Sequence, residues 1–251
     1  MTTPAQATAA GLAALVIWSA SVGLMRSMSE SIGLLTGPAL ASLLGGVLAL
    51  AWVRWRGGSL SRMLSLPPKY LFGCGALFIS CNVSLYIAVG TCRSRSQTLV
   101  VALVNYLWPA LTVALSVPLL KRRSPPALPL GILVAVAGTA VAILGGGRLS
   151  ASDLGFWATG RGIFALAMAL VAAVSWGLYS NLSRLWGDPD QGAVPLFALA
   201  TAAALGALLL FKPETPHWTI RGIIEVCGIG ILSLMAAYAL WDYGMRRGDH
   251  G

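Results

Sequence analysis

The chain has 251 residues, of which 57% are hydrophobic and 10% are charged, and its formal net charge is +9. Soluble domains carry about 25% charged residues, so this composition excludes a soluble globular protein and indicates an integral membrane protein. The Lys and Arg residues lie in short loops between apolar runs, where they orient membrane spans beside anionic lipids, and we expect no nucleic-acid partner. The four cysteines are scattered and form no C-x-x-C motif. We therefore expect no metal site, and no cofactor is implied.

Eight apolar runs are long enough to cross a bilayer whose hydrocarbon core is about 30 Å thick. We expect spans at residues 8–25, 32–53, 70–91, 97–120, 127–145, 162–183, 192–211 and 221–244. The connections are short, so the prediction is an all-α polytopic membrane protein, a single helical bundle in the lipid bilayer. The largest Lys and Arg clusters, at residues 54–69 and 121–123, both lie on the same side of the membrane as the N-terminus. The positive-inside rule therefore predicts that this side is cytoplasmic.

The fourth predicted span contains no charge, but its middle reads NYLWP from residue 105 to 109. Its polar side chains share one helical face, because the residues concerned are three or four apart. That face consists of Gln97, Val101, Asn105, Trp108 and Thr112. Polar groups at this depth are costly unless they meet protein or water. Pro109 removes a backbone donor, so we expect a kink there and a conformational hinge.

Three tryptophans within predicted spans, each beside small or polar residues, indicate a shared cavity. Indole and phenol rings provide stacking faces and hydrogen-bond donors, and they hold cations over the ring. Asparagine side chains can both donate and accept, which suits them to orient polar groups of a ligand. The candidate substrate-binding residues are Trp18, Asn82, Tyr86, Asn105, Tyr106, Trp108 and Trp176. The alternative is that these tryptophans pack against neighbouring helices and the asparagines form interhelical hydrogen bonds.

An internal repeat is indicated by two pairs of similar segments at nearly the same offset. The sequence around Trp18 resembles that around Trp176, and the end of the third span resembles the end of the eighth. Five spans in the first copy would place the second upside down, which is the inverted-repeat plan of many secondary transporters. We expect a first repeat at 1–147, a linker at 148–161 and an incomplete second repeat of three spans at 162–251.

Two acidic residues lie within predicted spans, Glu225 and Asp242, both in the eighth. A carboxylate in a membrane span is a functional candidate, and Asp242 is the better one because it lies in the repeated segment. Arg246 follows four residues later, which is ion-pair spacing on a helix. A coupling role for Asp242 and a plain ion pair with Arg246 both remain open.

The tryptophan of the first span, NYLWP in the fourth, and Trp241-Asp242-Tyr243 before a basic pair resemble the drug/metabolite transporter superfamily, EamA type. Within it the pattern is most similar to the YddG group of aromatic amino acid exporters. The resemblance implies ten spans in two inverted five-helix repeats, of which the last two are expected to lie beyond the eight spans readable here. It also implies a bacterial inner-membrane location with a cytoplasmic N-terminus.

The implied function is export of aromatic amino acids and related small metabolites by alternating access through an aromatic-lined cavity. Small multidrug antiporters of the superfamily carry a glutamate in their first span, whereas residues 8–24 contain no carboxylate. We therefore expect facilitated diffusion instead of strict proton antiport. We also expect a monomer whose partners are small-molecule substrates and lipid.

The alternatives include proteins of other classes and another exporter of the same superfamily. An enzyme is not expected, because His217 and His250 lie in a loop and at the terminus and no H-E-x-x-H or G-x-S-x-G motif occurs. A channel or a structural membrane protein remains an alternative, although a conducting pore would carry a more continuous polar lining. Another exporter of the superfamily, for other metabolites or drugs, is the nearest alternative.

Overall fold

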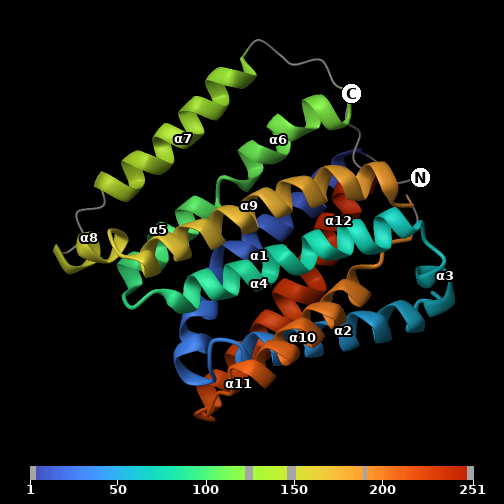
Figure 1. Cartoon of the computed structure of the whole chain (residues 1–251). Coiled ribbons are helices and arrows are strands. Elements are labelled where there is room, and N and C mark those ends of the chain that lie inside the picture. Colours follow the sequence, from blue (N-terminus) through green and yellow to red (C-terminus); the bar gives the residue numbers. More distant parts are fainter. Residues whose placement is uncertain (1–3, 122–126, 146–150, 189–190, 248–251) are drawn as a thin grey trace. The chain divides into compact units, whose positions relative to one another are not determined.

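The computed structural model describes residues 4–121, 127–145, 151–188 and 191–247, and every regular element in these ranges is a helix (Figure 1). The helices are α1 (Pro4–Ser31), α2 (Thr36–Trp55), α3 (Leu60–Leu64), η1 (Lys69–Cys74), α4 (Gly75–Thr91), α5 (Arg95–Asn105), α6 (Trp108–Leu119), α7 (Leu128–Gly145), α8 (Ala151–Trp157), α9 (Gly160–Trp186), α10 (Val194–Phe211), α11 (Ile220–Gly228), η2 (Ile229–Ala237) and α12 (Tyr238–Arg247). The segments η1 and η2 have the wider π-helical turn. The predicted all-α membrane fold is confirmed.

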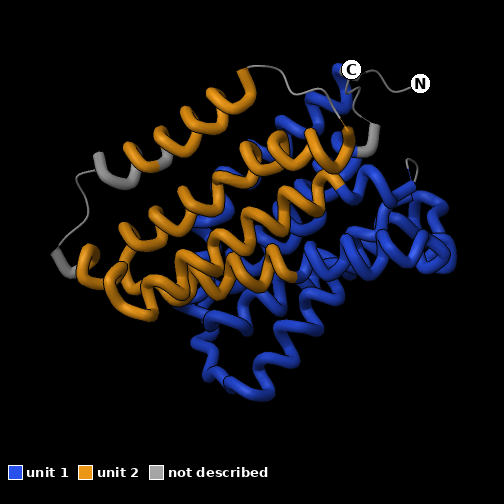
Figure 2. The backbone as a smooth tube through the Cα atoms, turned by 45° about the horizontal axis from the view of Figure 1, so that its top comes forward, with its two compact units in different colours: residues 1–79, 182–251 blue, residues 80–181 orange. Residues whose placement is uncertain are grey.

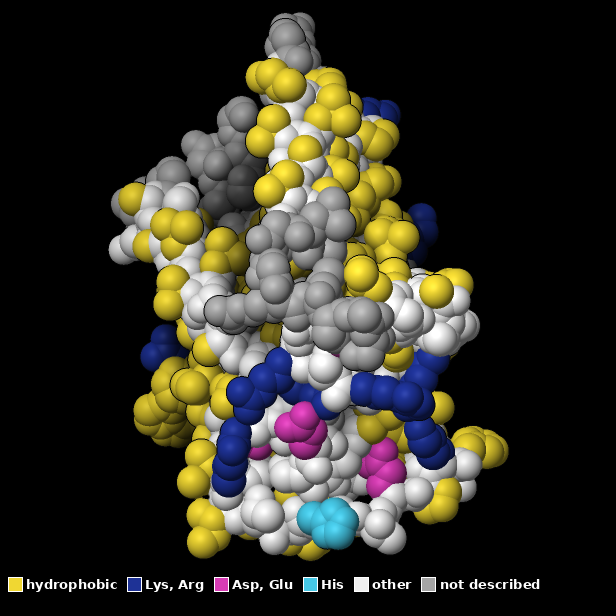
Figure 3. All heavy atoms as spheres, turned by 90° about the vertical axis from the view of Figure 1, so that its left-hand side faces the viewer, with side chains coloured by type: hydrophobic (Ala, Val, Ile, Leu, Met, Phe, Trp, Pro, Cys, Tyr) yellow, Lys and Arg dark blue, Asp and Glu magenta, His cyan; other side chains and the backbone are white. Residues whose placement is uncertain are grey.

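Seven helical stretches among the described residues are long and apolar enough to cross a membrane. They are Ala5–Ser31, Thr36–Trp55, Lys69–Thr91, Arg95–Leu119, Gly160–Trp186, Val194–Phe211 and Ile220–Met245. Each coincides with a predicted span. The remaining predicted span forms α7, whose described apolar stretch, Leu128–Gly138, is shorter. Hydrophobic side chains cover much of the face in Figure 3, and charged side chains gather in a band. The chain is therefore a multi-pass membrane protein.

The chain forms two compact units (Figure 2). Unit 1 comprises residues 1–79 and 182–251, and unit 2 comprises residues 80–181. Each unit contains helices from both predicted repeats. A compact unit is thus a different division from a sequence repeat, and the repeat boundaries stay a prediction.

Two adjacent glycines allow α2 to pack closely in unit 1. A Cβ atom on Gly45 would lie 2.6 Å from the carbonyl oxygen of Gly230 in η2. A Cβ atom on Gly46 would lie 2.8 Å from Cγ of Leu199 in α10. Small residues let membrane helices approach at the backbone, where dispersion contacts replace the hydrophobic effect as the source of association. The pair therefore places α2 between η2 and α10.

A buried aspartate holds the N-terminal end of α5 in unit 2. Asp153 of α8 is 5% exposed, and its carboxylate accepts hydrogen bonds from Ser94 Oγ at 2.7 Å and Gln97 Nε2 at 2.9 Å. Gln97 is the first residue of the polar face predicted on the fourth span. Its side-chain amide is hydrogen-bonded to protein at the end of the span, which offsets the cost of a polar group in a membrane helix.

Candidate functional site

The fourth span is interrupted between Asn105, which ends α5, and Trp108, which begins α6. The Leu107 N–H donates to the Val104 carbonyl at 3.2 Å, three residues back instead of four. Pro109 explains the interruption, because it lacks an N–H and its ring would collide with the carbonyl of Asn105 in a continuous helix. In the first turn of α6 the missing N–H costs no intrahelical bond.

The polar face predicted for this span is the buried face on both sides of the interruption. Gln97, Val101, Asn105 and Trp108 are buried, and Thr112 is half-buried, with its hydroxyl donating to the Trp108 carbonyl at 2.8 Å. Tyr106 is set apart, because it lies in the interruption and is 39% exposed. The spacing argument therefore identified which side of the span faces protein.

Three aromatic rings form a cluster between α6 and α9, which we call the Trp176 cluster: Trp108, Trp176 and Tyr179. The rings of Trp108 and Trp176 meet edge to face, with centroids 6.3 Å apart and an interplanar angle of 89°. Trp176 and Tyr179 are stacked, at 4.9 Å and 24°. All three side chains are buried. Two of the three predicted tryptophans are thus in direct ring contact.

Gly177 and Asn181 hold α9 against the first turns of α6. A Cβ atom on Gly177 would lie 3.3 Å from both Leu111 Cβ and Thr112 N. Asn181 Nδ2 donates to the carbonyl oxygens of Thr112 and Gly177, each at 2.9 Å. These contacts lie about one turn beyond Trp108, so they fix the part of α6 that carries the indole.

The predicted polar residues of the third and fourth spans are buried in the same unit as this cluster. Asn82 and Tyr86 lie on α4, and Asn105 is the last residue of α5. Ser175, next to Trp176, donates to Ser80 on the N-terminal side of α4 at 3.1 Å. The structure therefore packs α9 against α4 as well as α6, and a substrate-orienting role for the amides stays a prediction.

Trp18 belongs to unit 1, where its ring packs on the end of the eighth span. It lies 5.1 Å from the Tyr238 ring and 5.7 Å from the Trp241 ring. The Tyr238 ring in turn lies 4.7 Å from that of Phe78. These contacts fit the alternative of helix packing stated above, and a cavity-lining role for Trp18 stays a prediction.

The two carboxylates of the eighth span have different surroundings. Glu225 is buried and forms an ion pair with Arg221, at 2.9 Å between Oε1 and Nε. Asp242 is 4% exposed on α12. The side chain of Arg246 lies outside the described part of the structure, so the predicted pair with Asp242 stays a prediction.

Sequence reasoning missed Tyr179 and Asn181. Tyr179 is three residues after Trp176 and hence on the same helical face, and Asn181 is four residues after Gly177. Both signals were present in the sequence.

Known proteins match almost the whole chain. The EamA-like transporter family matches residues 6–144. An aromatic amino acid exporter YddG from Ancylobacter novellus is 32% identical over 246 residues, covering 97% of this chain and 80% of that protein. The exporter of the same name from Salmonella typhimurium is 28% identical over 247 residues, with 98% and 82% covered. One crystal structure of a protein has 29% identity and a TM-score of 0.77, covering 98% of this chain and 80% of the other. The resemblance drawn from short motifs is confirmed.

Proposed function

Because this chain belongs to the EamA-like transporter family, we propose that it exports aromatic amino acids and related small metabolites across the bacterial inner membrane by alternating access. The relatives with matching sequences are named aromatic amino acid exporters, which supports this substrate class. The observation that carries the proposal is the Trp176 cluster beside the interrupted fourth span.

The chemistry of the cluster suits an aromatic zwitterion. The faces and edges of Trp108, Trp176 and Tyr179 can stack with an aromatic side chain and hold an ammonium group over a ring. The buried amides of Asn82 and Asn105 each supply donors and an acceptor for a carboxylate or an ammonium group. Such a site distinguishes an amino acid from a plain hydrocarbon without requiring a charged residue.

The interrupted backbone adds polar groups that a continuous helix would hide. The last carbonyls of α5 and the first N–H groups of α6 lie at helix ends, where intrahelical partners run out. Transporter sites often use such half-helices, with the positive N-terminal end directed at a substrate carboxylate. Pro109 would act as the hinge between them during alternating access.

We further propose transport by facilitated diffusion in a monomer with a cytoplasmic N-terminus. The absence of a carboxylate from residues 8–24 supports facilitated diffusion. The distribution of Lys and Arg between the loops supports the cytoplasmic N-terminus. Purified protein in liposomes preloaded with tryptophan should release it without a pH gradient. Strict dependence on a pH gradient would contradict this part of the proposal.

The proposed site is tested by Trp108→Ala. Efflux of tryptophan and phenylalanine should fall about tenfold, the factor that corresponds to losing an aromatic contact of about 1.4 kcal/mol. Membrane expression, measured by immunoblot, should change far less. Trp218→Ala is the matched control, since Trp218 is 60% exposed before α11. Undiminished efflux from Trp108→Ala at equal expression would remove Trp108 from the site.

A further inference from the structure

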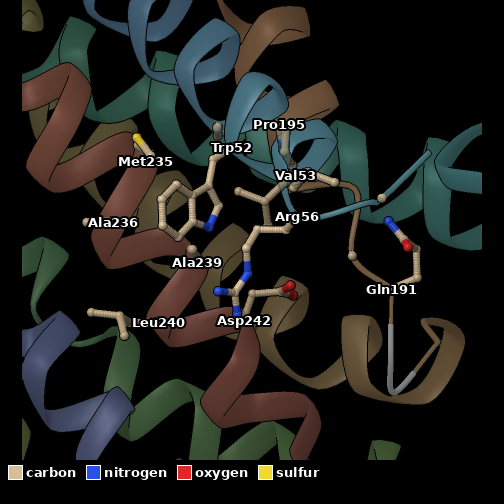
Figure 4. Close-up of a pocket in the computed structure, with 14 residues that line it drawn as sticks. Trp52, Val53, Arg56, Gln191, Pro195, Met235, Ala236, Ala239, Leu240 and Asp242 are labelled. Carbon is tan, nitrogen blue, oxygen red and sulfur yellow. The ribbon is translucent and has the colours of Figure 1, made fainter. Parts of the chain in front are cut away.

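A cavity of about 570 Å³ lies in unit 1, and its lining includes no residue of the Trp176 cluster (Figure 4). It is formed by the C-terminal end of α2, the segment that leads into α10, and the continuous helix of η2 and α12. The lining runs from the exposed side chain of Trp52 to the buried residues Val194 and Pro195, so the cavity extends inward from the surface. Cavities of about 300–1,000 Å³ are typical of sites for small molecules.

The walls of this cavity are largely apolar. Among the lining residues are Ala49, Val53, Pro195, Met235, Ala236 and Leu240. Ala49 precedes Arg56 by about two helical turns, so the apolar lining extends about 10 Å from Arg56 toward the middle of the span. Lipid hydrocarbon is as apolar as these side chains, so an acyl chain can fill the space without leaving a polar group unpaired.

The mouth of the cavity lies at the level of the lipid headgroups. The Trp52 and Trp55 rings at the end of α2 are 49% and 75% exposed, with centroids 5.1 Å apart, and exposed tryptophans at span ends mark the membrane–water interface. Arg56 follows directly, and its guanidinium carbon lies 5.7 Å from the centroid of the Trp52 ring. The apolar cavity and the cation thus lie at the depths of an acyl chain and of a headgroup.

The segment around the mouth is cationic. Residues 52–69 contain no Asp or Glu and four cationic residues: Arg54, Arg56, Arg62 and Lys69. These four side chains are exposed and form no ion pair with any described residue. Basic pockets between membrane helices bind the headgroups of anionic lipids, because the phosphate meets several positive charges. Asp242 also borders the cavity, but it is 4% exposed and already interacts within the chain, so we assign it no contact with a ligand.

We propose that this cavity binds an anionic phospholipid, with its phosphate on Arg56 and one acyl chain along Met235 and Ala239. The Arg guanidinium can donate two parallel hydrogen bonds to a phosphate, and its exposed position leaves it within reach of the headgroups. In the proposed topology this is the cytoplasmic leaflet. The inference requires only that the chain lies in a bilayer, so it goes beyond the proposed function and does not depend on export.

The test is native mass spectrometry of the purified full chain in neutral detergent, titrated with phosphatidylglycerol or with phosphatidylcholine of the same acyl chains. The first phosphatidylglycerol should bind about tenfold more tightly. Arg56→Gln should remove this preference, since tenfold is the factor for one charge-assisted hydrogen bond. Arg54→Gln is the matched control, because Arg54 is an exposed cation of the same segment outside the cavity lining, and it should retain most of the preference.

A second pair of variants tests the acyl-chain part of the site. Ala239→Phe places a ring in the cavity at an exposed position, and it should weaken phosphatidylglycerol about tenfold, the loss expected when one aromatic-sized apolar contact is displaced. Ala51→Phe is the control, since Ala51 is exposed on α2 and outside the lining. Because a ligand of the native state raises the unfolding temperature, phosphatidylglycerol should raise it in the wild type and in both controls, and much less in Arg56→Gln and Ala239→Phe. Each variant is compared with its own lipid-free protein, so a loss of stability is not mistaken for a loss of binding.

Three outcomes would overturn the proposal. Equal losses in Arg56→Gln and Arg54→Gln would mean that the segment attracts anionic lipid diffusely, without a site. Displacement of phosphatidylglycerol by glycerol 3-phosphate, which has the phosphate but no acyl chain, would reduce the site to a phosphate contact. Displacement by tryptophan would give the cavity to a transport substrate. None of these assays measures transport, so failure of the lipid site leaves the proposed export to be decided by its own efflux test.

Discussion

The aromatic residues of the two compact units differ in what surrounds them. In unit 1 the rings of Trp18, Tyr238, Phe78, Phe197 and Tyr70 form a chain with successive centroids 5.1, 4.7, 5.8 and 5.5 Å apart. The helices that carry this chain continue through the contacts without a break, although Tyr70 lies in the π-helical segment η1 and Tyr238 directly follows the π-helical segment η2. In unit 2 the Trp176 cluster is smaller and lies where the helical backbone breaks.

The difference shows that aromatic rings within membrane spans do not by themselves identify a binding site. A chain of rings in contact fills space between continuous helices and is explained by packing. Rings at a helix end, together with the buried amide of Asn105, lie beside backbone groups that lack intrahelical partners, and our proposed substrate site depends on this arrangement. The backbone interruption is therefore the distinguishing feature of unit 2.

Phe78→Ala should have the largest effect on stability, because Phe78 is fully buried in the middle of the unit 1 chain. Removing its ring should lower the free energy of unfolding by about 3–5 kcal/mol, through lost contacts with Tyr238 and Phe197 and the cavity left behind. Thermal unfolding in detergent measures the loss. Efflux should fall only in proportion to the folded protein.

Phe72→Ala is the control for this substitution, since Phe72 lies in η1 of the same span and is 77% exposed. It should leave stability nearly unchanged. A Phe78→Ala protein that stays fully stable yet loses efflux would mean that the unit 1 rings take part in transport, and the contrast between the units would disappear.

Asn181→Leu should have an intermediate effect on stability. The substitution removes the hydrogen bonds to the Thr112 and Gly177 carbonyls while keeping the side-chain volume, and it should cost about 1–2 kcal/mol. Efflux should fall further than the amount of folded protein, because the bond to the Thr112 carbonyl holds α6 about one turn beyond Trp108. Ser116→Ala is the control, since its hydroxyl bonds to Val113 on an exposed part of α6. Equal effects of the two substitutions on efflux would contradict a special role for Asn181.

The positions of the spans, the buried face of the fourth span and its interruption could be predicted from local sequence. Hydropathy over about 20 residues located the spans, and three- and four-residue spacing located the buried face of the fourth span. Pro109 predicted the disturbance of the helix, because its effect on the preceding turn is a property of the residue itself. These features depend on neighbours within one helix.

Contacts between distant segments could not be predicted in the same way. Gln97 bonds to Asp153, which lies in a segment predicted as a linker. Nothing local distinguished Trp18, which packs on the eighth span, from Trp108, which packs on the sixth. Which ring meets which depends on helix rotation and close approach. A short motif does not fix either, and three or four residues of error in register would change the partner.

The close approach of α9 to α6 offers the finest comparison, through Gly177→Ala and Gly206→Ala. Alanine is favoured over glycine within a helix by about 1 kcal/mol. A Cβ atom on Gly206 in α10 would have nothing within 4 Å, so that variant should gain most of this amount. A Cβ atom on Gly177 would lie 3.3 Å from Leu111 Cβ, so the gain should be offset and the net change should be near zero. Thermal unfolding of the two variants in parallel measures the difference. Equal stabilisation would show that α9 and α6 have room to separate, and the Trp176 cluster would then lose the rigid support that we assign to it.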